Sequence, residues 1–275
     1  MKTQAAKAAE FAAMHDTGCF VIPNPWDIGS ARILAALGYK ALTTTSAGFA
    51  RTNGVADYNV TRDMVVAHVR ALAVATDLPL AADLENGFGH RPEDCAETVR
   101  LGAEAGLVGG SIEDFTGNPD DRFYSIEAAT DRIRAAAEAA KALPYKFMLV
   151  ARAENYLHGN TDLADTIKRL QAYQEAGADV LYAPVLSSAD DIRAVVTSLD
   201  RPVNVLAGCG GVTGSLDELA ALGVRRVSVG NWFHSAALTG FIAAARAAQS
   251  GDFGFVGGLV PGGELNRLLD EGAAG

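Results

Sequence analysis

The sequence predicts an α/β protein of the (β/α)8 TIM-barrel type, in which eight parallel strands alternate with helices and close into a ring. Its 275 residues are 49% hydrophobic, which suits one barrel, since barrels typically contain about 250 residues. A helix end, a glycine and a short β run also recur at residues 35–45, 103–113, 174–183 and 220–230. Glycine just past a helix turns the chain into the next strand, so this repetition indicates successive βα units. An open doubly wound sheet is the alternative, but the chain has no early glycine-rich nucleotide loop, which favours the barrel.

Eight short β-type runs are the predicted strands. They cover residues 19–22, 41–45, 80–83, 108–113, 147–152, 179–182, 203–206 and 226–229. Helices fill the gaps, and two have clear starts: Pro92 and the acids after it open a helix over residues 92–105, and Ser125 caps a helix over 125–142. An extra helix is predicted over residues 3–15, and the last barrel helix over 232–249.

No second domain is evident, so residues 1–275 are predicted to form one domain whose tail, residues 250–275, lies beyond the barrel. The tail is apolar and rich in glycine over residues 251–261, and it ends in a short predicted helix over 264–269. Exposed apolar residues at this density commonly meet a partner surface. We therefore predict that the tail is an oligomerisation element in a homodimer or homotetramer. Packing of the tail on its own barrel is the alternative.

The bulk composition disfavours several classes of partner. The formal net charge is -10 and the sequence pI is about 4.9, which argues against nucleic acid and anionic membranes as partners. No apolar run reaches the length needed to span a bilayer. The three cysteines, Cys19, Cys95 and Cys209, are far apart and form neither a disulfide framework nor a zinc spacing. A cytoplasmic protein that binds a small molecule is the simplest interpretation.

Acidic residues end two neighbouring predicted strands. Asp83 and Glu85 follow one apolar run, and Glu113 ends the next. The carboxyl ends of barrel strands converge on one crevice, and Asp83 and Glu85 would share a face if the extended backbone continued. One strand-end acid alone more often solvates a loop or caps a helix, whereas three on adjacent strands suit a hard cation. We predict that Asp83, Glu85 and Glu113 bind Mg2+, with Mn2+ as the alternative, directly or through water.

Residues suited to an anionic substrate end two other predicted strands. Arg152 ends the fifth strand, where its guanidinium either pairs with Glu154 or Glu113 or binds a substrate carboxylate. The run after the second strand is Thr44, Thr45, Ser46, Ala47 and Gly48. Hydroxyl and N–H groups in such a turn can hold a carboxylate or oxyanion. Asp57, in the same loop, is either an acid near the metal or a simple turn residue.

Other motifs add no second kind of chemistry. A glycine-rich segment, residues 208–214, follows the seventh predicted strand, where many barrels bind phosphate. It has no P-loop lysine and does not match a dinucleotide fingerprint, so phosphate binding there is the less favoured interpretation. The five histidines show no paired spacing, and no Gly-x-Ser-x-Gly elbow is present.

Several motifs together resemble the isocitrate lyase / phosphoenolpyruvate mutase superfamily. In family order they are Asn24-Pro25-Trp26-Asp27, Ala31-Arg32, the Ser46 turn, Asp83-Leu84-Glu85-Asn86-Gly87-Phe88-Gly89, Ile112-Glu113-Asp114 and Ala151-Arg152-Ala153-Glu154. The resemblance implies a (β/α)8 barrel with Mg2+, a 2-oxo or 2-hydroxy carboxylic acid as substrate, and cleavage of a C–C or C–P bond through an enolate. It also implies a C-terminal helix swapped between the subunits of a dimer or tetramer.

The resemblance also implies roles for individual residues. By position, the metal site is Asp83, Glu85 and Glu113; the catalytic residues are Ser46, Asp57, Glu113 and Arg152; and the substrate-binding residues are Thr44, Thr45, Ser46, Ala47, Gly48, Asn118 and Arg152. Of these, Arg152 and the Ser46 turn would hold the carboxylate of the 2-oxo acid, and Asn118 would lie on the active-site loop.

One segment departs from the family pattern. Lyases of the family carry Lys-Lys-Cys-Gly-His, with a catalytic cysteine, after the Glu-Asp pair, whereas residues 115–122 contain neither cysteine nor lysine. An isocitrate or methylisocitrate lyase reaction is therefore disfavoured. Decarboxylation of an oxaloacetate-like acid needs no cysteine and is favoured, followed by a retro-aldol cleavage. The alternatives are a C–P bond enzyme of the phosphonopyruvate type and a non-catalytic protein that binds 2-oxo acids.

Overall fold

Eight parallel strands form one sheet that curves into a barrel. The structure, a computed structural model, describes residues 1–208 and 214–274. Neighbouring strands pair in the order β1-β8-β7-β6-β5-β4-β3-β2. The two ends of the sheet also meet, because the N–H of Thr43 donates a hydrogen bond of 3.1 Å to the carbonyl of Pro23, just beyond β1. The predicted (β/α)8 barrel is confirmed, and the open-sheet alternative is wrong.

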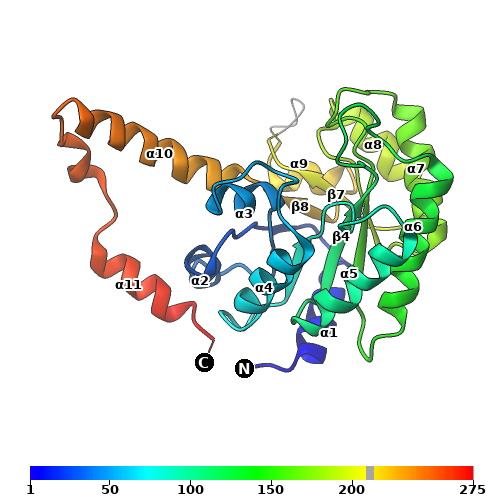
Figure 1. The fold of residues 1–275 in the computed structure, drawn as a ribbon, viewed down its shortest axis with the longest axis horizontal. Coiled ribbons are helices and arrows are strands. Elements are labelled where there is room, and N and C mark those ends of the chain that lie inside the picture. The colour runs from blue at the N-terminus through cyan, green and yellow to red at the C-terminus, as the bar shows by residue number, and fades with distance from the viewer. Residues whose placement is uncertain (209–213, 275) are drawn as a thin grey trace.

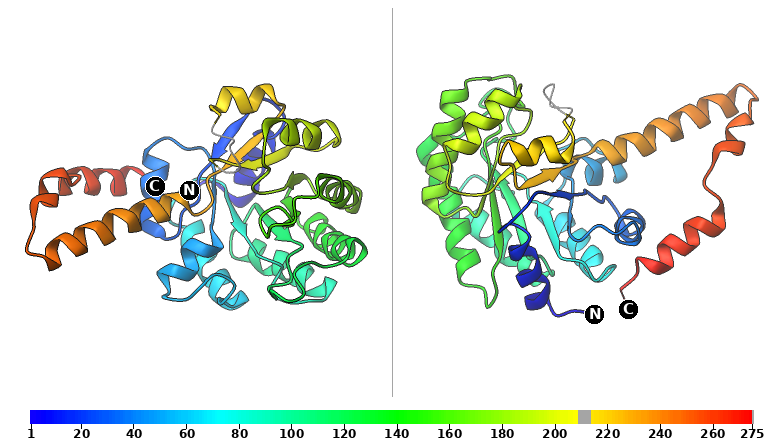
Figure 2. Two further views of the ribbon diagram at one scale, coloured as in Figure 1. Left: turned by 90° about the horizontal axis from the view of Figure 1, so that it is seen from above. Right: turned by 180° about the vertical axis from the view of Figure 1, so that it is seen from behind.

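The elements lie close to their predicted places. The strands are β1 (Phe20–Ile22), β2 (Leu42–Thr43), β3 (Leu80–Asp83), β4 (Gly109–Glu113), β5 (Met148–Arg152), β6 (Val180–Tyr182), β7 (Val203–Leu206) and β8 (Arg226–Ser228). The helices around them (Figures 1 and 2) are α2 (Ile28–Ala36), α3 (Ser46–Thr52), α4 (Arg62–Ala73), α5 (Pro92–Glu104), α6 (Ile126–Lys141), α7 (Leu163–Ala176), α8 (Ala189–Thr197) and α9 (Leu216–Ala221).

The second strand is shorter than predicted. We expected a strand over residues 41–45 followed by a polar turn, but β2 ends at Thr43. Thr45 caps helix α3 instead, and its hydroxyl accepts a hydrogen bond of 3.3 Å from the N–H of Gly48. A hydroxyl at this position satisfies an amide that the first turn of a helix leaves unpaired. The polar run therefore begins a helix rather than a loop.

A plug of apolar side chains fills the amino-terminal end of the barrel. Phe11, from helix α1 (Gln4–Ala13), packs with Ile22, Met148 and Val150 inside the ring of strands. The extra N-terminal helix that the sequence predicted is thus present and closes one end of the barrel. The opposite end, where the strands finish, is left for a site.

A buried histidine beside this plug is expected to lower the stability of the fold in acid. His15 is 4% exposed, and its Nδ1 lies 2.8 Å from the Phe11 carbonyl oxygen. Burial, and then the charge of Arg226, lower the pKa of His15 from 6.5 to about 4. Between these two pH values the unfolded chain binds a proton at His15 and the folded chain does not. The free energy of unfolding therefore falls as the pH drops through this window, by about 3 kcal/mol.

Replacing His15 with glutamine should remove most of this acid sensitivity, because glutamine can still donate to the Phe11 carbonyl but does not titrate. We expect the decrease in the free energy of unfolding from pH 7 to pH 4, measured by urea denaturation, to be about 2–3 kcal/mol smaller than in the wild type. His90→Gln, at an exposed histidine, is the control and should behave as the wild type. Equal pH dependence in His15→Gln and the wild type would contradict the assignment.

The C-terminal tail leaves the barrel and then returns. Helix α10 (Trp232–Gln249) was predicted as the last barrel helix, but it leaves the barrel, so the tail begins with α10 rather than at residue 250. The 3-10 turn η1 (Gly254–Gly258) and α11 (Gly262–Glu271) follow it. Helix α10 projects away from the barrel and α11 runs back towards α2 (Figures 1 and 2). In the part of the chain that the structure describes, no helix combines the length and the apolar character required to cross a membrane.

The two surfaces of the tail differ in what covers them. Beyond α11, the N–H of Ala274 donates a hydrogen bond of 3.2 Å to the Ala75 carbonyl, so the end of the tail packs on its own barrel. By contrast, Phe241 and Phe253 are 68% and 64% exposed. The end of the tail thus packs on its own barrel, as the alternative prediction stated. The apolar surface around Phe241 and Phe253 stays uncovered in the single chain.

Candidate active site

Arg152 is the centre of a charged cluster at the open end of the barrel. It ends β5 and lies opposite Glu113, the last residue of β4, in the register of these strands. Its Nη1 atom lies 3.0 Å from Asp83 Oδ1 and 3.2 Å from Glu113 Oε2. Its Nε atom lies 2.8 Å from Glu154 Oε1. The pairing with Glu113 and Glu154 that the sequence allowed is observed, and Asp83 joins it.

Burial controls the charge of this cluster. Burial alone would lower the pKa of Arg152, but Glu154, Asp83 and Glu113 together raise it well above the ordinary value, so the guanidinium stays charged. Burial raises the pKa of Glu154 to about 7 although Arg152 opposes the shift. Burial also raises the pKa of Glu113, again against Arg152. Three carboxylates share one guanidinium, so the cluster is short of positive charge.

Tyr58 completes the surroundings of Glu113. Its hydroxyl donates a hydrogen bond of 2.6 Å to Glu113 Oε1, so Glu113 contacts Tyr58 through one oxygen and Arg152 through the other. Tyr58 reaches this place from the loop between α3 and α4, where its φ is 62°. No sequence pattern pointed to Tyr58, because a tyrosine in a loop carries no spacing that predicts a contact 55 residues away in the chain.

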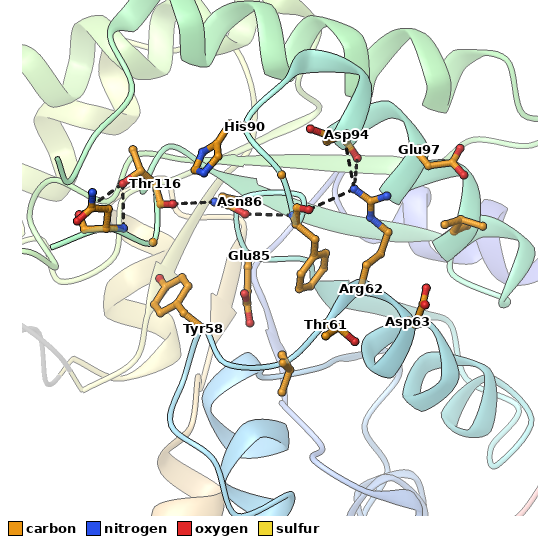
Figure 3. A pocket seen from close by; sticks show the side chains of 16 residues that line it. Tyr58, Thr61, Arg62, Asp63, Glu85, Asn86, His90, Asp94, Glu97 and Thr116 are labelled. Atoms are coloured by element: carbon orange, nitrogen blue, oxygen red, sulfur yellow. Dashed lines mark hydrogen bonds and ion pairs between the residues drawn. The ribbon is translucent and has the colours of Figure 1, made fainter. Parts of the chain in front are cut away.

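Glu85 lines a different cavity from Asp83. The sequence argument required the backbone to stay extended past Asp83, but β3 ends there and Glu85 has a φ of 48°, so that condition is not met. Glu85 points into a neighbouring pocket of about 940 Å3, beside Tyr58 (Figure 3). Its Oε1 is buried without a hydrogen-bond partner. Burial, with the charges of Asp83 and Asp57, raises the pKa of Glu85 to about 8.

A second cavity, of about 480 Å3, opens at the mouth of the barrel, and we call it the barrel-mouth cavity. The predicted site residues that line it are Thr44, Thr45, Ser46, Ala47, Asp57, Asp83 and Arg152. Thr44 also fixes Asp83, because its Oγ1 accepts a hydrogen bond of 3.1 Å from the Asp83 N–H. The N–H groups of Ser46 and Ala47 begin α3 and have no acceptor within that helix, so they suit an anion.

Two predicted substrate-binding residues lie outside the barrel-mouth cavity. Gly48 is not part of its lining, and a side chain there would collide with Thr45 and Trp26, so packing rather than ligand approach requires this glycine. Asn118 lines the 940 Å3 pocket with Glu85. Its amide oxygen accepts a hydrogen bond of 3.0 Å within its own loop. The glycine-rich segment considered for phosphate falls largely on residues 209–213, which lie outside the described residues.

Asp57 lies at the candidate site. It lines the barrel-mouth cavity, and its Oδ1 atom is buried without a hydrogen-bond partner. Burial and the charge of Asp83 raise its pKa, while a hydrogen bond with Ser46 and the charge of Arg152 oppose the shift. Asp57 therefore adds a further carboxylate to an already acidic cavity.

Asp114 supports the cluster from behind the strands, which the sequence did not indicate. Its Oδ1 accepts a hydrogen bond of 2.8 Å from the N–H of Glu154. Its Oδ2 accepts from the Tyr173 hydroxyl at 2.6 Å and from Arg169 Nη1 at 3.1 Å. Helix α7 thus holds the end of β5 in place. The Glu-Asp pair marks this position, but only the first acid carries an obvious ligand role in sequence.

The carboxylates are ligands of the type that hard cations prefer, but they do not form a complete coordination site. No group of three His, Cys, Asp or Glu side chains in the described chain is arranged to hold a metal. Three carboxylates nevertheless have a buried oxygen without a hydrogen-bond partner among the described residues: Asp57, Glu85 and Glu154. This excess of negative charge and of unpaired oxygens fits a divalent cation, since Mg2+ needs only one or two protein oxygens and keeps several waters.

A (β/α)8 barrel whose strand ends gather carboxylates around one arginine belongs to the class of barrel enzymes with a site at the carboxyl face. A model of the phosphoenolpyruvate phosphomutase family matches residues 11–249, and the chain belongs to this family. The superfamily that the motifs resemble is therefore confirmed.

Solved structures and curated relatives agree with this assignment. A candidate lyase or mutase of Burkholderia cenocepacia J2315 is 55% identical, with a TM-score of 0.93 over 96% of this chain and 95% of its own. The 2-methylisocitrate lyase of Escherichia coli (strain K12) is 33% identical over 174 residues, which are 60% of this chain and 57% of the lyase. The oxaloacetate decarboxylase of Pseudomonas entomophila (strain L48) is 26% identical over 227 residues, 80% of this chain and 76% of the decarboxylase. These relatives with named activities are lyases.

Proposed function

We propose that this protein is a Mg2+-dependent lyase that cleaves a C–C bond of a small 2-oxo or 2-hydroxy carboxylic acid. The observation that carries the proposal is the barrel-mouth cavity, where Arg152 is held among Asp83, Glu113 and Glu154 beside the first turn of α3. A guanidinium fork and helical N–H groups bind a carboxylate, and the acids suit a hard cation.

Asp83 and Glu113 are the residues that would hold the cation, with Asp57 and Glu154 nearby to accept hydrogen bonds from its waters. Glu85, which the sequence placed with them, points into the neighbouring pocket. Bound Mg2+ supplies Lewis-acid stabilisation of the negative charge that develops on the 2-oxygen when the neighbouring bond breaks. Mn2+ shares the preference for oxygen ligands and is the alternative metal. Support comes from one buried carboxylate oxygen each of Asp57 and Glu154, which have no hydrogen-bond partner among the described residues.

The protein's own residues orient the acid and position the charges. Arg152 and the first N–H groups of α3 would bind the substrate carboxylate, which places the bond beyond the 2-carbon in the cavity. Thr44 fixes the backbone of Asp83, because its hydroxyl oxygen accepts a hydrogen bond from the Asp83 N–H. Tyr58 stays protonated, and its hydroxyl donates a hydrogen bond to Glu113. In decarboxylation, the bond between the 3-carbon and its carboxylate breaks, CO2 leaves, and the electron pair remains as the enolate of the 2-oxo product, which then takes a proton from water.

Decarboxylation of an oxaloacetate-like acid is the reaction that we favour, and retro-aldol cleavage is the second choice. Residues 115–122 contain no cysteine that could act as in the lyases of the family, and loss of CO2 needs no such group. The 26% identity to an oxaloacetate decarboxylase over 80% of this chain supports the same choice. A C–P bond reaction on phosphonopyruvate is the alternative, and the family to which the chain belongs favours it.

The test is turnover of four acids by the purified protein: oxaloacetate, 2-methylisocitrate, 2,3-dimethylmalate and phosphonopyruvate, each with Mg2+ and with EDTA. We expect product from at least one acid with Mg2+ and none above the uncatalysed rate with EDTA. Turnover that persists in EDTA would contradict the proposed dependence on a metal ion. Tight binding of a 2-oxo acid without any product would favour the non-catalytic binding protein instead.

We also propose that the tail joins copies of this chain into a dimer or tetramer, by exchange of α10. Large apolar residues stay exposed along α10 and around η1, among them Leu238, Phe241, Ile242, Phe253, Val256 and Leu259. An apolar cavity of about 610 Å3 lies among α2, α10 and α11 and is lined by side chains such as Ile33, Phe233 and Leu265. The same chain thus offers apolar side chains and an apolar cavity, as a self-complementary interface requires.

Replacing both Phe241 and Phe253 with serine should convert the oligomer to a monomer, because it removes two large apolar anchors from the surface that would be buried. The measurement is molar mass by light scattering after gel filtration at micromolar concentration. Val74→Ser, at an exposed valine at the end of α4, is the control and should leave the mass unchanged. A wild type of monomer mass under these conditions would contradict the assembly.

A further inference from the structure

A second arginine lies inside the barrel, among polar side chains that a barrel interior rarely contains. Arg226 begins β8 and is 4% exposed. Its Nε atom donates a hydrogen bond of 2.9 Å to Asn204 Oδ1. Asn204, fully buried, donates in turn to Ser228 Oγ at 3.0 Å. Bulky apolar residues dominate the interior of such barrels, so this polar cluster needs an explanation.

The protein does not neutralise the charge of Arg226. Its Nη1 atom is buried and has no hydrogen-bond partner among residues 1–208 and 214–274. Burial lowers the pKa of Arg226 to about 10; Tyr182 opposes this shift and the charge of Arg152 adds to it. Neither side chain is a carboxylate. A buried charge without a counter-ion is costly. Stability of the fold therefore does not explain an arginine at this position.

Arg226 and Arg152 line the same barrel-mouth cavity. In the register of the sheet, Arg152 pairs with Tyr182, Tyr182 with Asn204, and Asn204 with Arg226. The two arginines are thus three strands apart, which is about 14 Å along the curved sheet. Their side chains reach a shared space of about 480 Å3 from two sides. This arrangement presents two separate positive groups to one small ligand.

We propose that Arg226 is a second anion-binding group of this cavity, and that the substrate is a dicarboxylic 2-oxo or 2-hydroxy acid whose distal carboxylate it binds. The proposal rests on the proposed function, in which Arg152 and the first turn of α3 hold the other carboxylate. The guanidinium fork matches the two oxygens of a carboxylate. Among the described residues the Nη1 atom has no acceptor, so it supplies a free donor, and Ser228 lines the same cavity.

The test compares acids of equal chain length that differ only in the distal carboxylate. The pairs are 2-oxopentanoate with 2-oxoglutarate, and 2-hydroxybutyrate with malate. Dissociation constants are measured by calorimetry with Mg2+ for the wild type, Arg226→Met and Arg225→Met. Arg225 is the matched control, because it donates to the Gly18 carbonyl at 3.2 Å and is not part of the cavity lining.

For the wild type and Arg225→Met, we expect at least one dicarboxylate to bind at least about tenfold more tightly than the monocarboxylate of its pair. In Arg226→Met this preference should disappear, while affinity for the monocarboxylates stays within about twofold. If the wild type shows no preference for the dicarboxylate, or if Arg226→Met keeps that preference, the proposed role of Arg226 is overturned. Monocarboxylate binding without a preference overturns this proposal alone. No binding of any acid contradicts the proposed function as well.

Thermal unfolding without ligand separates a binding role from a folding role. Methionine removes a buried charge that has no counter-ion, so Arg226→Met should melt at or above the wild-type temperature. A lower Tm than that of Arg225→Met would assign Arg226 to the fold and overturn the proposal. Arg226→Lys keeps the charge without the fork, and we expect it to fold and to retain only part of the preference. Loss of folding in both variants would likewise assign the residue to the fold.

Discussion

Arg152→Met is expected to lower kcat/KM by at least about 1000-fold and to destabilise the fold by about 3–5 kcal/mol. Activity falls because the guanidinium would hold the substrate carboxylate by both charge and shape. Stability falls because Asp83, Glu113 and Glu154 lose a shared counter-charge while they remain buried. The measurements are steady-state kinetics with the best acid of the panel and urea denaturation at pH 7.

Arg152→Lys separates these two effects. Lysine keeps the positive charge, but its single ammonium group cannot reproduce both the Nη1 contacts and the Nε contact of the arginine. We expect it to recover most of the stability while kcat/KM stays at least about 100-fold below the wild type. Arg100→Met, at an exposed arginine of α5, is the control and should change the free energy of unfolding by less than about 0.5 kcal/mol. Normal kcat/KM in Arg152→Met would remove the residue from the site.

Asp83→Asn is expected to abolish Mg2+-dependent turnover without weakening the fold. Asp83 Oδ1 accepts hydrogen bonds from Arg152 Nη1 at 3.0 Å and from the Glu85 N–H at 3.2 Å. An asparagine oxygen can accept both, so the geometry is preserved and only the charge is lost. Loss of one carboxylate from a cluster with excess negative charge also relieves repulsion. In EDTA, the variant should therefore melt at or above the wild-type temperature, while kcat with Mg2+ falls by at least about 1000-fold.

A surface acid provides the comparison for this substitution. Asp131, on α6, is exposed and pairs with Arg134 on its own helix. Asp131→Asn makes the same chemical change outside the barrel and should leave both kcat and the effect of Mg2+ on Tm unchanged. If Asp83→Asn unfolds at a lower temperature than Asp131→Asn in EDTA, Asp83 is a structural acid and the metal assignment loses its main ligand.

The fold could be predicted because its signals are local. Glycine after a helix and a short apolar run recur with each βα unit, and the right-handed connection of parallel strands leaves few arrangements. The boundary of β2 could not be predicted, because Thr45 can end a strand or cap a helix and only the packing of α3 decides. The place of the tail was ambiguous for a similar reason: exposed and packed apolar residues look alike in sequence.

The candidate site could be predicted where residues end strands. Asp83, Glu113 and Arg152 stand at strand ends, and parallel pairing brings such positions together. Glu85 lies two residues past a strand, where one left-handed backbone conformation turns its side chain into another pocket. Tyr58 and Arg226 could not be predicted, because their contacts depend on loop conformation and on the direction in which a strand residue points.

The most direct test of the account is calorimetric titration of Mg2+ into the wild-type protein and into Asp83→Asn, with oxalate present as a stand-in for a 2-oxo carboxylate. The account predicts saturable binding of one Mg2+ per chain to the wild type, and a Kd at least about 100-fold weaker for Asp83→Asn. Absence of Mg2+ binding to the wild type, or equal binding to both proteins, would contradict it.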